Sequence, residues 1–140
     1  MILGIGTDIT DIQRIAQTLE EQGMRFVERC FAPEERDRIE SREATHRASG
    51  YAKRWAAKEA CAKALGRGIR DGIFLKDIVV INDAEGKPSL VLRGAAERRL
   101  SDMTPQGMQP RLDVSLSDEP PMAMAFVVIS AQKDAEHDGQ

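Results

Sequence analysis

The stretch ATHRASGYAKRWAAKEACAKALG, residues 44–66, predicts one long helix. Alanine, the strongest helix former, recurs through this stretch, and Gly66 stands where a helix C-terminus is expected. Glu59 and Lys63 are four residues apart, so their side chains lie on one side of the helix, one turn from each other. The small residues Ala52 and Ala56 share that side, and they would let a neighbouring strand come close.

The first strand of the chain offers a matching surface. Residues 2–7 are mainly apolar and predict a buried strand. Because strand side chains alternate between two faces, Gly4, Gly6 and Asp8 share one face. Glycine weakens a strand, and its use twice on one face indicates that another backbone element approaches there. If the long helix is that element, the carboxylates of Asp8 and Glu59 converge.

Two carboxylates at one point predict a bound cation, because their mutual repulsion is costly without one. Magnesium typically binds one or two carboxylates together with the phosphates of a substrate. Lys63 would then be a point charge beside those phosphates. Two ordinary interpretations stay open: Asp8 could cap the helix that follows the strand, and Glu59 and Lys63 could form a routine surface ion pair.

The rest of the chain predicts a single α+β domain with a mostly antiparallel sheet, on which the one long helix packs. We assign residues 1–131 to this domain and residues 132–140 to a flexible tail, which has almost nothing to bury. The other expected elements are a helix capped by Thr10 or Asp11 that stops at Gly23, a short helix around 26–31, a helix from Pro33, a loop at 66–72, strands at 77–82 and 89–92 joined by a hairpin turn, a helix at 94–103, a loop at 104–110, strands at 112–117 and 122–130, and a turn at 118–121.

Composition and charge exclude several classes of protein. The net charge of −3 argues against generic nucleic-acid binding. Residues 24–70 carry 12 Lys or Arg against 7 Asp or Glu, which suits a polyanionic ligand or an acidic partner, or else a solvated helix surface. Cys30 and Cys61 lie outside any metal-binding motif, so a zinc site or disulfide framework is not expected. The opening residues are too short for a signal peptide or membrane span, and we expect a cytoplasmic protein.

Three sequence blocks occur in order and together resemble the holo-acyl-carrier-protein synthase family, the small phosphopantetheinyl transferases of bacterial fatty-acid synthesis. The blocks are GIGTDI at 4–9, RWAAKEACAKA at 54–64 and DVSLSD at 113–118, and the likeness extends from Met1 to about Ser130. Enzymes of the family transfer 4′-phosphopantetheine from coenzyme A to a serine of an apo acyl carrier protein with Mg²⁺, and they release adenosine 3′,5′-bisphosphate. The resemblance also implies a homotrimer with active sites between subunits.

The resemblance assigns functions to individual residues. Asp8 and Glu59 would hold Mg²⁺ against the pyrophosphate of coenzyme A. Glu59 would also activate the incoming serine, directly or through a bound water. Lys63 would stabilise charge on the leaving bisphosphate. Arg54, with neighbouring cations of the basic segment, would bind the 3′-phosphate of coenzyme A.

Further positions carry weaker assignments. The hairpin turn Gly86, Lys87 and Pro88 resembles the family segment that lines the adenine pocket. Arg14 and Arg25 are candidates for contact with the acidic carrier protein, and simple solvation is the alternative for both.

The chain departs from the family pattern at Asp113, where many relatives carry histidine. Aspartate cannot donate a charged hydrogen bond to a phosphate and would repel one nearby. A histidine contact with coenzyme A is therefore not transferable, and another cation would have to replace it.

Two other functions compete with the transferase. A Mg²⁺-dependent phosphohydrolase would turn over coenzyme A or a nucleotide without a carrier protein, although a water-activating histidine is not evident near Asp8, Glu59 and Lys63. A non-catalytic module would bind coenzyme A or a carrier protein without transferring anything.

Overall fold

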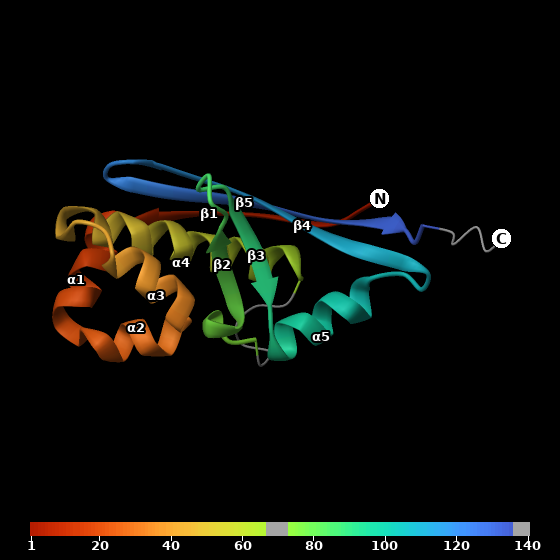
Figure 1. Cartoon of the computed structure of the whole chain (residues 1–140), viewed down its shortest axis with the longest axis horizontal. Helices are drawn as coiled ribbons and strands as arrows, with labels where there is room; N and C mark the ends of the chain where they lie inside the picture. Colours follow the sequence, from red (N-terminus) through yellow and green to blue (C-terminus); the bar gives the residue numbers. More distant parts are fainter. Residues whose placement is uncertain (67–72, 136–140) are drawn as a thin grey trace.

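The computed structural model describes residues 1–66 and 73–135, and it confirms the expected α+β architecture (Figure 1). None of the helices in these residues is long and apolar enough to cross a membrane. The elements are, in order, β1 (Ile2–Asp11), α1 (Ile12–Gln22), α2 (Met24–Cys30), α3 (Pro33–Glu40), a 3₁₀ turn (Ala44–His46), α4 (Arg47–Ala64), a second 3₁₀ turn (Leu75–Asp77), β2 (Ile78–Asn82), β3 (Pro88–Leu92), α5 (Gly94–Met103), β4 (Met108–Glu119) and β5 (Met122–Lys133).

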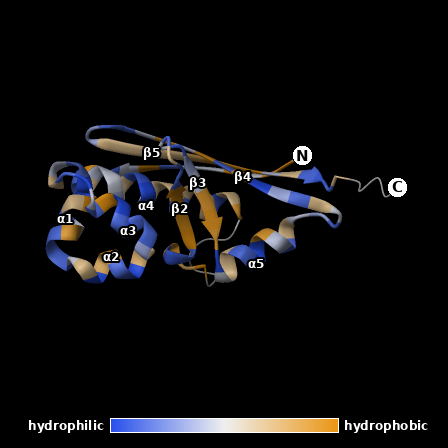
Figure 2. Ribbon diagram, viewed as in Figure 1, coloured by the Kyte–Doolittle hydropathy of each residue, from blue (hydrophilic) through white to orange (hydrophobic). Residues whose placement is uncertain are grey.

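The central helix α4 lies between two antiparallel sheets. A long three-stranded sheet of order β1-β5-β4 covers one side of α4, and the β2–β3 hairpin covers another (Figure 1). Helices α1 to α3 gather at one end of the molecule, and α5 lies toward the other. Figure 2 shows that β2 and β3 are apolar strands, whereas α3 is mostly hydrophilic. The main core is therefore formed where α4, the hairpin and the inner face of the long sheet meet.

The helix boundaries follow local sequence signals. The Asp11 side chain accepts a hydrogen bond from the Gln13 backbone N–H at 2.9 Å and so caps the start of α1. Gly23, with φ of 55°, ends α1 and donates its N–H to the Leu19 carbonyl. Asp11, rather than Asp8, is thus the residue that caps this helix.

The structure corrects several predicted boundaries. Strand β4 starts at Met108 and continues through Glu119, so the predicted loop at 104–110 and turn at 118–121 are too long. Pro110 lies within β4 because an edge strand tolerates a residue without an N–H. Met108 pairs with Lys133, which extends β5 two residues into the predicted tail. Residues 67–72 of the predicted loop at 66–72 and residues 136–140 of the predicted tail at 132–140 lie outside the described residues.

The two faces of β5 have different surroundings. Ala123 and Ala125 are fully buried against the core, whereas Met122 and Met124 point to the opposite face and are 37% and 43% exposed. Ile9 of β1, which pairs with Met124 of β5, is 62% exposed on that same face. We call the side of the long sheet that faces away from α4 the outer face; it carries an apolar stripe consisting of Ile5, Ile9, Met122, Met124 and Phe126.

The glycine face of β1 lies directly against α4, as the sequence predicts. A β-carbon added to Gly6 would lie 1.9 Å from the Ala60 carbonyl oxygen, and one added to Gly4 would lie 2.0 Å from that of Ala64. The closest approach is therefore at Ala60 and Ala64, not at Ala52 and Ala56 as predicted. Asp8 lies two residues beyond Gly6 on the same face of β1, so it also faces α4.

We expect Gly6→Ala to lower the free energy of unfolding by about 1–3 kcal/mol, because the new methyl group would force two backbones apart. Gly50→Ala is the matched control on α4: its β-carbon would meet Ile39 at 3.4 Å, and alanine favours helix more than glycine does. Urea unfolding of both variants measures the difference. Equal stabilities would contradict the close approach of β1 and α4.

A fully buried ion pair fixes α4 against α3 and β2. Lys58 Nζ lies 2.6 Å from Glu35 Oε1 and also donates to the backbone carbonyls of Leu75 and Ile78. The Glu35 carboxylate accepts hydrogen bonds from the Ala32 N–H at 3.0 Å and the Val80 N–H at 3.2 Å. The pair therefore satisfies backbone groups from three segments of the chain and sets how α4 is rotated.

Candidate active site

Asp8, near the end of β1, is held by two side chains. The Thr10 hydroxyl donates to Asp8 Oδ2 at 2.9 Å, and Lys63 Nζ donates to Asp8 Oδ1 at 3.2 Å. Lys63 Nζ also donates to the Thr7 carbonyl at 2.9 Å, so it bridges α4 and β1. Thr10 is buried and was expected only as a helix cap, so its contact with Asp8 was missed.

Glu59 shares a pocket with Asp8, and its surroundings disfavour the charged form. Burial raises the pKa of the Glu59 carboxyl, the negative charge of Asp8 raises it further, and the ammonium of Lys63 opposes both effects. The two predicted carboxylates are therefore close enough to repel each other, and the ammonium of Lys63 counteracts part of this repulsion.

The pocket around these carboxylates, here called the carboxylate pocket, has a volume of about 400 Å³. It is formed by β1, α1, α2 and α4. Phe26 and Trp55, whose ring centroids are 5.7 Å apart, make its apolar part, which the sequence analysis missed. Its remaining lining residues are Asp8, Ile9, Thr10, Asp11, Arg14, Ile15, Thr18, Arg29 and Glu59. Arg14 thus belongs to this pocket, whereas Arg25 lies on α2 and is not among the lining residues.

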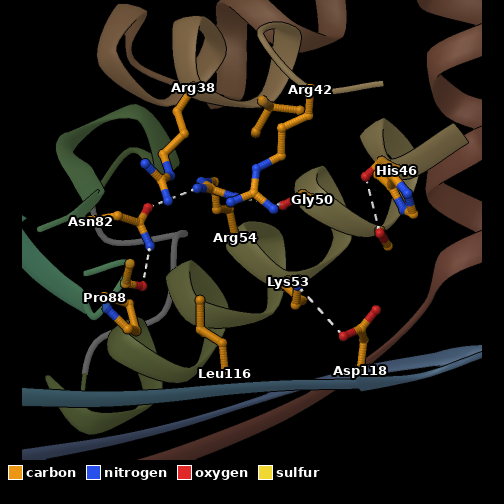
Figure 3. A pocket seen from close by; sticks show the side chains of 13 residues that line it. Arg38, Arg42, His46, Gly50, Lys53, Arg54, Asn82, Pro88, Leu116 and Asp118 are labelled. Atoms are coloured by element: carbon orange, nitrogen blue, oxygen red, sulfur yellow. Dashed lines mark hydrogen bonds and ion pairs between the residues drawn. The ribbon is translucent and has the colours of Figure 1, made fainter. Parts of the chain in front are cut away.

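A second pocket of about 440 Å³ is strongly basic (Figure 3). We call it the basic pocket. Arg38, Arg42 and Arg54 point toward one another in it, and Lys53 pairs with Asp118 at 3.5 Å along its lower side. Its lining residues are Arg38, Ile39, Arg42, His46, Ser49, Gly50, Lys53, Arg54, Asn82, Gly86, Pro88, Leu116 and Asp118.

Arg54 is held rigidly in the basic pocket. Only 7% of it is exposed; its guanidinium donates to the Gly50 carbonyl at 3.2 Å and to Asn82 Oδ1 at 2.9 Å. Asn82 in turn donates to the Gly86 carbonyl, which ties Arg54 to the hairpin turn. Burial lowers the pKa of Arg54, and its buried Nε has no hydrogen-bond partner among the described residues. A bound anion would accept a hydrogen bond from this Nε and would stabilise the charged guanidinium in its buried position.

The two pockets lie on different sides of the molecule. Glu59 follows Arg54 by five positions on α4, so their side chains leave the helix about 140° apart. The carboxylate pocket includes the end of β1, and the basic pocket includes Leu116 and Asp118 of β4. Strands β1 and β4 are the opposite edges of the three-stranded sheet. Among the described residues, the two pockets have no lining residue in common.

Two residues that the sequence analysis singled out, Lys87 and Asp113, line neither pocket. Lys87 is in the hairpin turn with Gly86 and Pro88 but, unlike them, does not line the basic pocket. Asp113 lies exposed on the outer face of β4, where Arg111 donates two hydrogen bonds to it at 2.9 and 3.2 Å. Arg111 therefore neutralises the Asp113 carboxylate, at the position where the family resemblance predicts histidine.

The donor atoms of the carboxylate pocket are of the kind that binds a hard divalent cation. The described residues contain no group of three or more His, Cys, Asp or Glu side chains placed to hold a metal. Two carboxylates alone match the coordination of magnesium, which keeps several positions for water and phosphate oxygens. The Glu59 carboxylate has a raised pKa and no hydrogen-bond or ion-pair partner among these residues, and a cation bound here would stabilise its charged form.

Comparison with known proteins gives consistent matches. Residues 4–115 match the family model of the 4′-phosphopantetheinyl transferase superfamily. A holo-[acyl-carrier-protein] synthase of Methylobacterium radiotolerans is 55% identical over 131 residues, which cover 94% of this chain and 95% of that protein. The crystal structure of the Neisseria meningitidis synthase has a TM-score of 0.80 at 38% identity and covers 93% of this chain and 99% of that one. The Bacillus anthracis synthase, solved in complex with CoA (3′,5′-ADP), has a TM-score of 0.74 at 32% identity over 92% of this chain and 96% of that one.

Proposed function

This chain belongs to the 4′-phosphopantetheinyl transferase superfamily, and we propose that one coenzyme A molecule spans the carboxylate pocket of one subunit and the basic pocket of the next. It is a transferase that moves the 4′-phosphopantetheine group from coenzyme A to a serine of an apo acyl carrier protein. The observation that supports the placement of the reaction is the meeting of Asp8 and Glu59 beside Lys63. The predicted cytoplasmic location stays a prediction.

In the carboxylate pocket, Glu59 accepts the proton of the serine hydroxyl as its oxygen attacks the pyrophosphate. A bond forms from this oxygen to the phosphorus that carries pantetheine, and the bond from that phosphorus to the adenosine bisphosphate breaks. The raised pKa of Glu59 makes it a better proton acceptor near neutral pH. Lys63 stabilises the charge that develops on the leaving bisphosphate.

Asp8 and Glu59 would hold Mg²⁺. When bound, the ion would neutralise the pyrophosphate and lower the cost of the charge that develops during transfer. The contact from Thr10 fixes the Asp8 carboxylate for this purpose. Little covalent chemistry is left for the protein, because transfer of this kind depends on positioning and charge neutralisation.

The basic pocket suits the 3′-phosphate of coenzyme A. Arg38, Arg42 and Arg54 provide guanidinium groups that match phosphate geometry, and Arg54 has a free buried N–H. Gly86 and Pro88 line the same pocket and would pack against adenine.

The acidic carrier protein would bind next to the carboxylate pocket. Arg14 lines the pocket from α1, and Arg25 follows on α2, so both basic side chains are presented near the reacting centre. Electrostatic attraction between these arginines and an acidic partner would orient the serine toward Glu59.

Because the two pockets lie at opposite edges of one sheet, a second subunit is needed to join them. A head-to-tail arrangement would place the β1 edge of one copy beside the β4 edge of the next, and repetition would close a ring of three. The apolar stripe of the outer face, from Ile5 to Phe126, would be covered in this trimer.

The activity is tested by incubating the protein with coenzyme A, Mg²⁺ and an apo acyl carrier protein. We expect the intact mass of the carrier to rise by one phosphopantetheinyl group. Hydrolysis of coenzyme A without a carrier would favour the phosphohydrolase, and binding without any mass change would favour the non-catalytic module.

We expect Arg54→Met to raise the KM for coenzyme A by roughly tenfold, because a charged hydrogen bond to the 3′-phosphate is lost. Glu59→Gln would instead abolish the chemical step. If each active site combines both pockets from neighbouring subunits, co-expressing the two variants should restore about one site in four, as random assembly predicts.

This restored activity is measured at a coenzyme A concentration well below the wild-type KM, where Glu59→Gln is inactive and Arg54→Met alone keeps roughly a tenth of the wild-type rate. Differently tagged subunits confirm that mixed assemblies have formed. No restored activity in such assemblies would contradict the sharing of sites between subunits.

A further inference from the structure

We propose that Lys63 holds the place of the cation in the metal-free protein. The Lys63 ammonium pairs with the Asp8 carboxylate. A divalent ion that binds this carboxylate displaces the ammonium, which can then move toward the phosphates of the substrate. This inference rests on the proposed binding of a metal by Asp8 and Glu59.

The contacts of Asp8 distinguish a fixed partner from a mobile one. Thr10 is buried and holds Oδ2, whereas Lys63 reaches Oδ1 from a side chain that is 57% exposed. The Asp8 side chain itself is only 17% exposed. Lys63 can therefore move into solvent on its flexible stem while Asp8 keeps its position.

Glu59 shows why a divalent ion would displace the ammonium. Within the described residues, no hydrogen bond or ion pair to the Glu59 carboxylate is found, and Lys63 only partly offsets the repulsion between Glu59 and Asp8. One ammonium balances a single charge of this pair, whereas a divalent ion balances both. The two cations compete for Oδ1 of Asp8 because like charges held at one oxygen repel each other.

The competition links metal binding to catalysis. While Lys63 is paired with Asp8 and with the Thr7 carbonyl, its ammonium is directed at β1 and away from a leaving group. Once displaced, it lies one helix turn from Glu59 and is free to meet the bisphosphate. The catalytic cation thus becomes available only in the metal-loaded protein.

Direct titration with Mn²⁺, followed by the electron paramagnetic resonance of the free ion and without coenzyme A, tests the proposal. Lys63→Met should bind Mn²⁺ roughly threefold to fivefold more tightly than the wild type, which is the value of a partly exposed ion pair. Lys63→Arg keeps the charge and should bind like the wild type. Lys53→Met is the matched control, since it removes one lysine charge from the same helix next to Asp118.

Tighter binding by Lys63→Met alone supports the proposal. Equal or weaker binding by this variant, including no binding to either protein, would overturn it. An equal gain in Lys53→Met would also overturn it, because the effect would then be one of net charge. Transfer to the carrier protein is assayed separately, so failure of the proposed function is distinguishable from failure of this competition.

Discussion

Glu59→Gln should reduce the rate of transfer to the carrier protein by at least about a hundredfold, because glutamine can neither accept the serine proton nor bind a divalent ion well. The variant should unfold at the same temperature as the wild type or slightly above it. Burial and the charge of Asp8 both raise the pKa of Glu59, so the folded protein carries this charge at a cost, and glutamine removes that cost.

Two measurements separate this result from a loss of folding. The initial rate of the mass increase on the carrier gives the activity, and thermal unfolding at a fixed protein concentration gives the stability. Glu97→Gln on α5 is the matched control and should keep full activity, because Glu97 lies outside both the carboxylate and the basic pocket. Full activity of Glu59→Gln would remove this residue from the mechanism.

The sequence predicts the carboxylate pocket well because local rules determine it. The two-residue repeat of a strand places Gly4, Gly6 and Asp8 on one face, and helix periodicity places Glu59 next to Lys63. The structure brings these groups together through the approach of β1 to α4. Thr10 was missed because its hydrogen bond to Asp8 depends on β1 continuing to Asp11.

The basic pocket is harder to predict because it combines side chains from distant segments. Charge asymmetry indicates an anion site in residues 24–70, and the family resemblance names Arg54 there, but only the fold selects Arg38 and Arg42 as its neighbours from the many other cations. Asn82 gives no sequence signal, since its function is to connect Arg54 with the hairpin turn. Lengths of β4 and β5 were also underestimated, because their pairing outweighs the prolines and polar residues near their ends.

Lys58→Met should lower the free energy of unfolding by about 3–5 kcal/mol, because it leaves the fully buried charge of Glu35 without a partner. Lys58 directly precedes Glu59 on α4, so loss of this anchor should also let the carboxylate pocket shift and reduce activity. Burial lowers the pKa of Lys58, and Glu35 opposes part of this effect, which stabilises the charged pair inside the core. Urea unfolding at a fixed protein concentration measures the loss.

A double variant, Lys58→Met with Glu35→Leu, separates the ion pair from its backbone contacts. Replacement of a buried ion pair by apolar residues is often harmless, which would predict full recovery. Here we expect little recovery, because the carbonyls of Leu75 and Ile78 and the N–H of Val80 would lose their partners. The exposed pair between Arg93 and Glu34, at 3.1 Å, is the control, and Arg93→Met should cost less than about 1 kcal/mol. Full recovery in the double variant would show that Lys58 and Glu35 serve only each other.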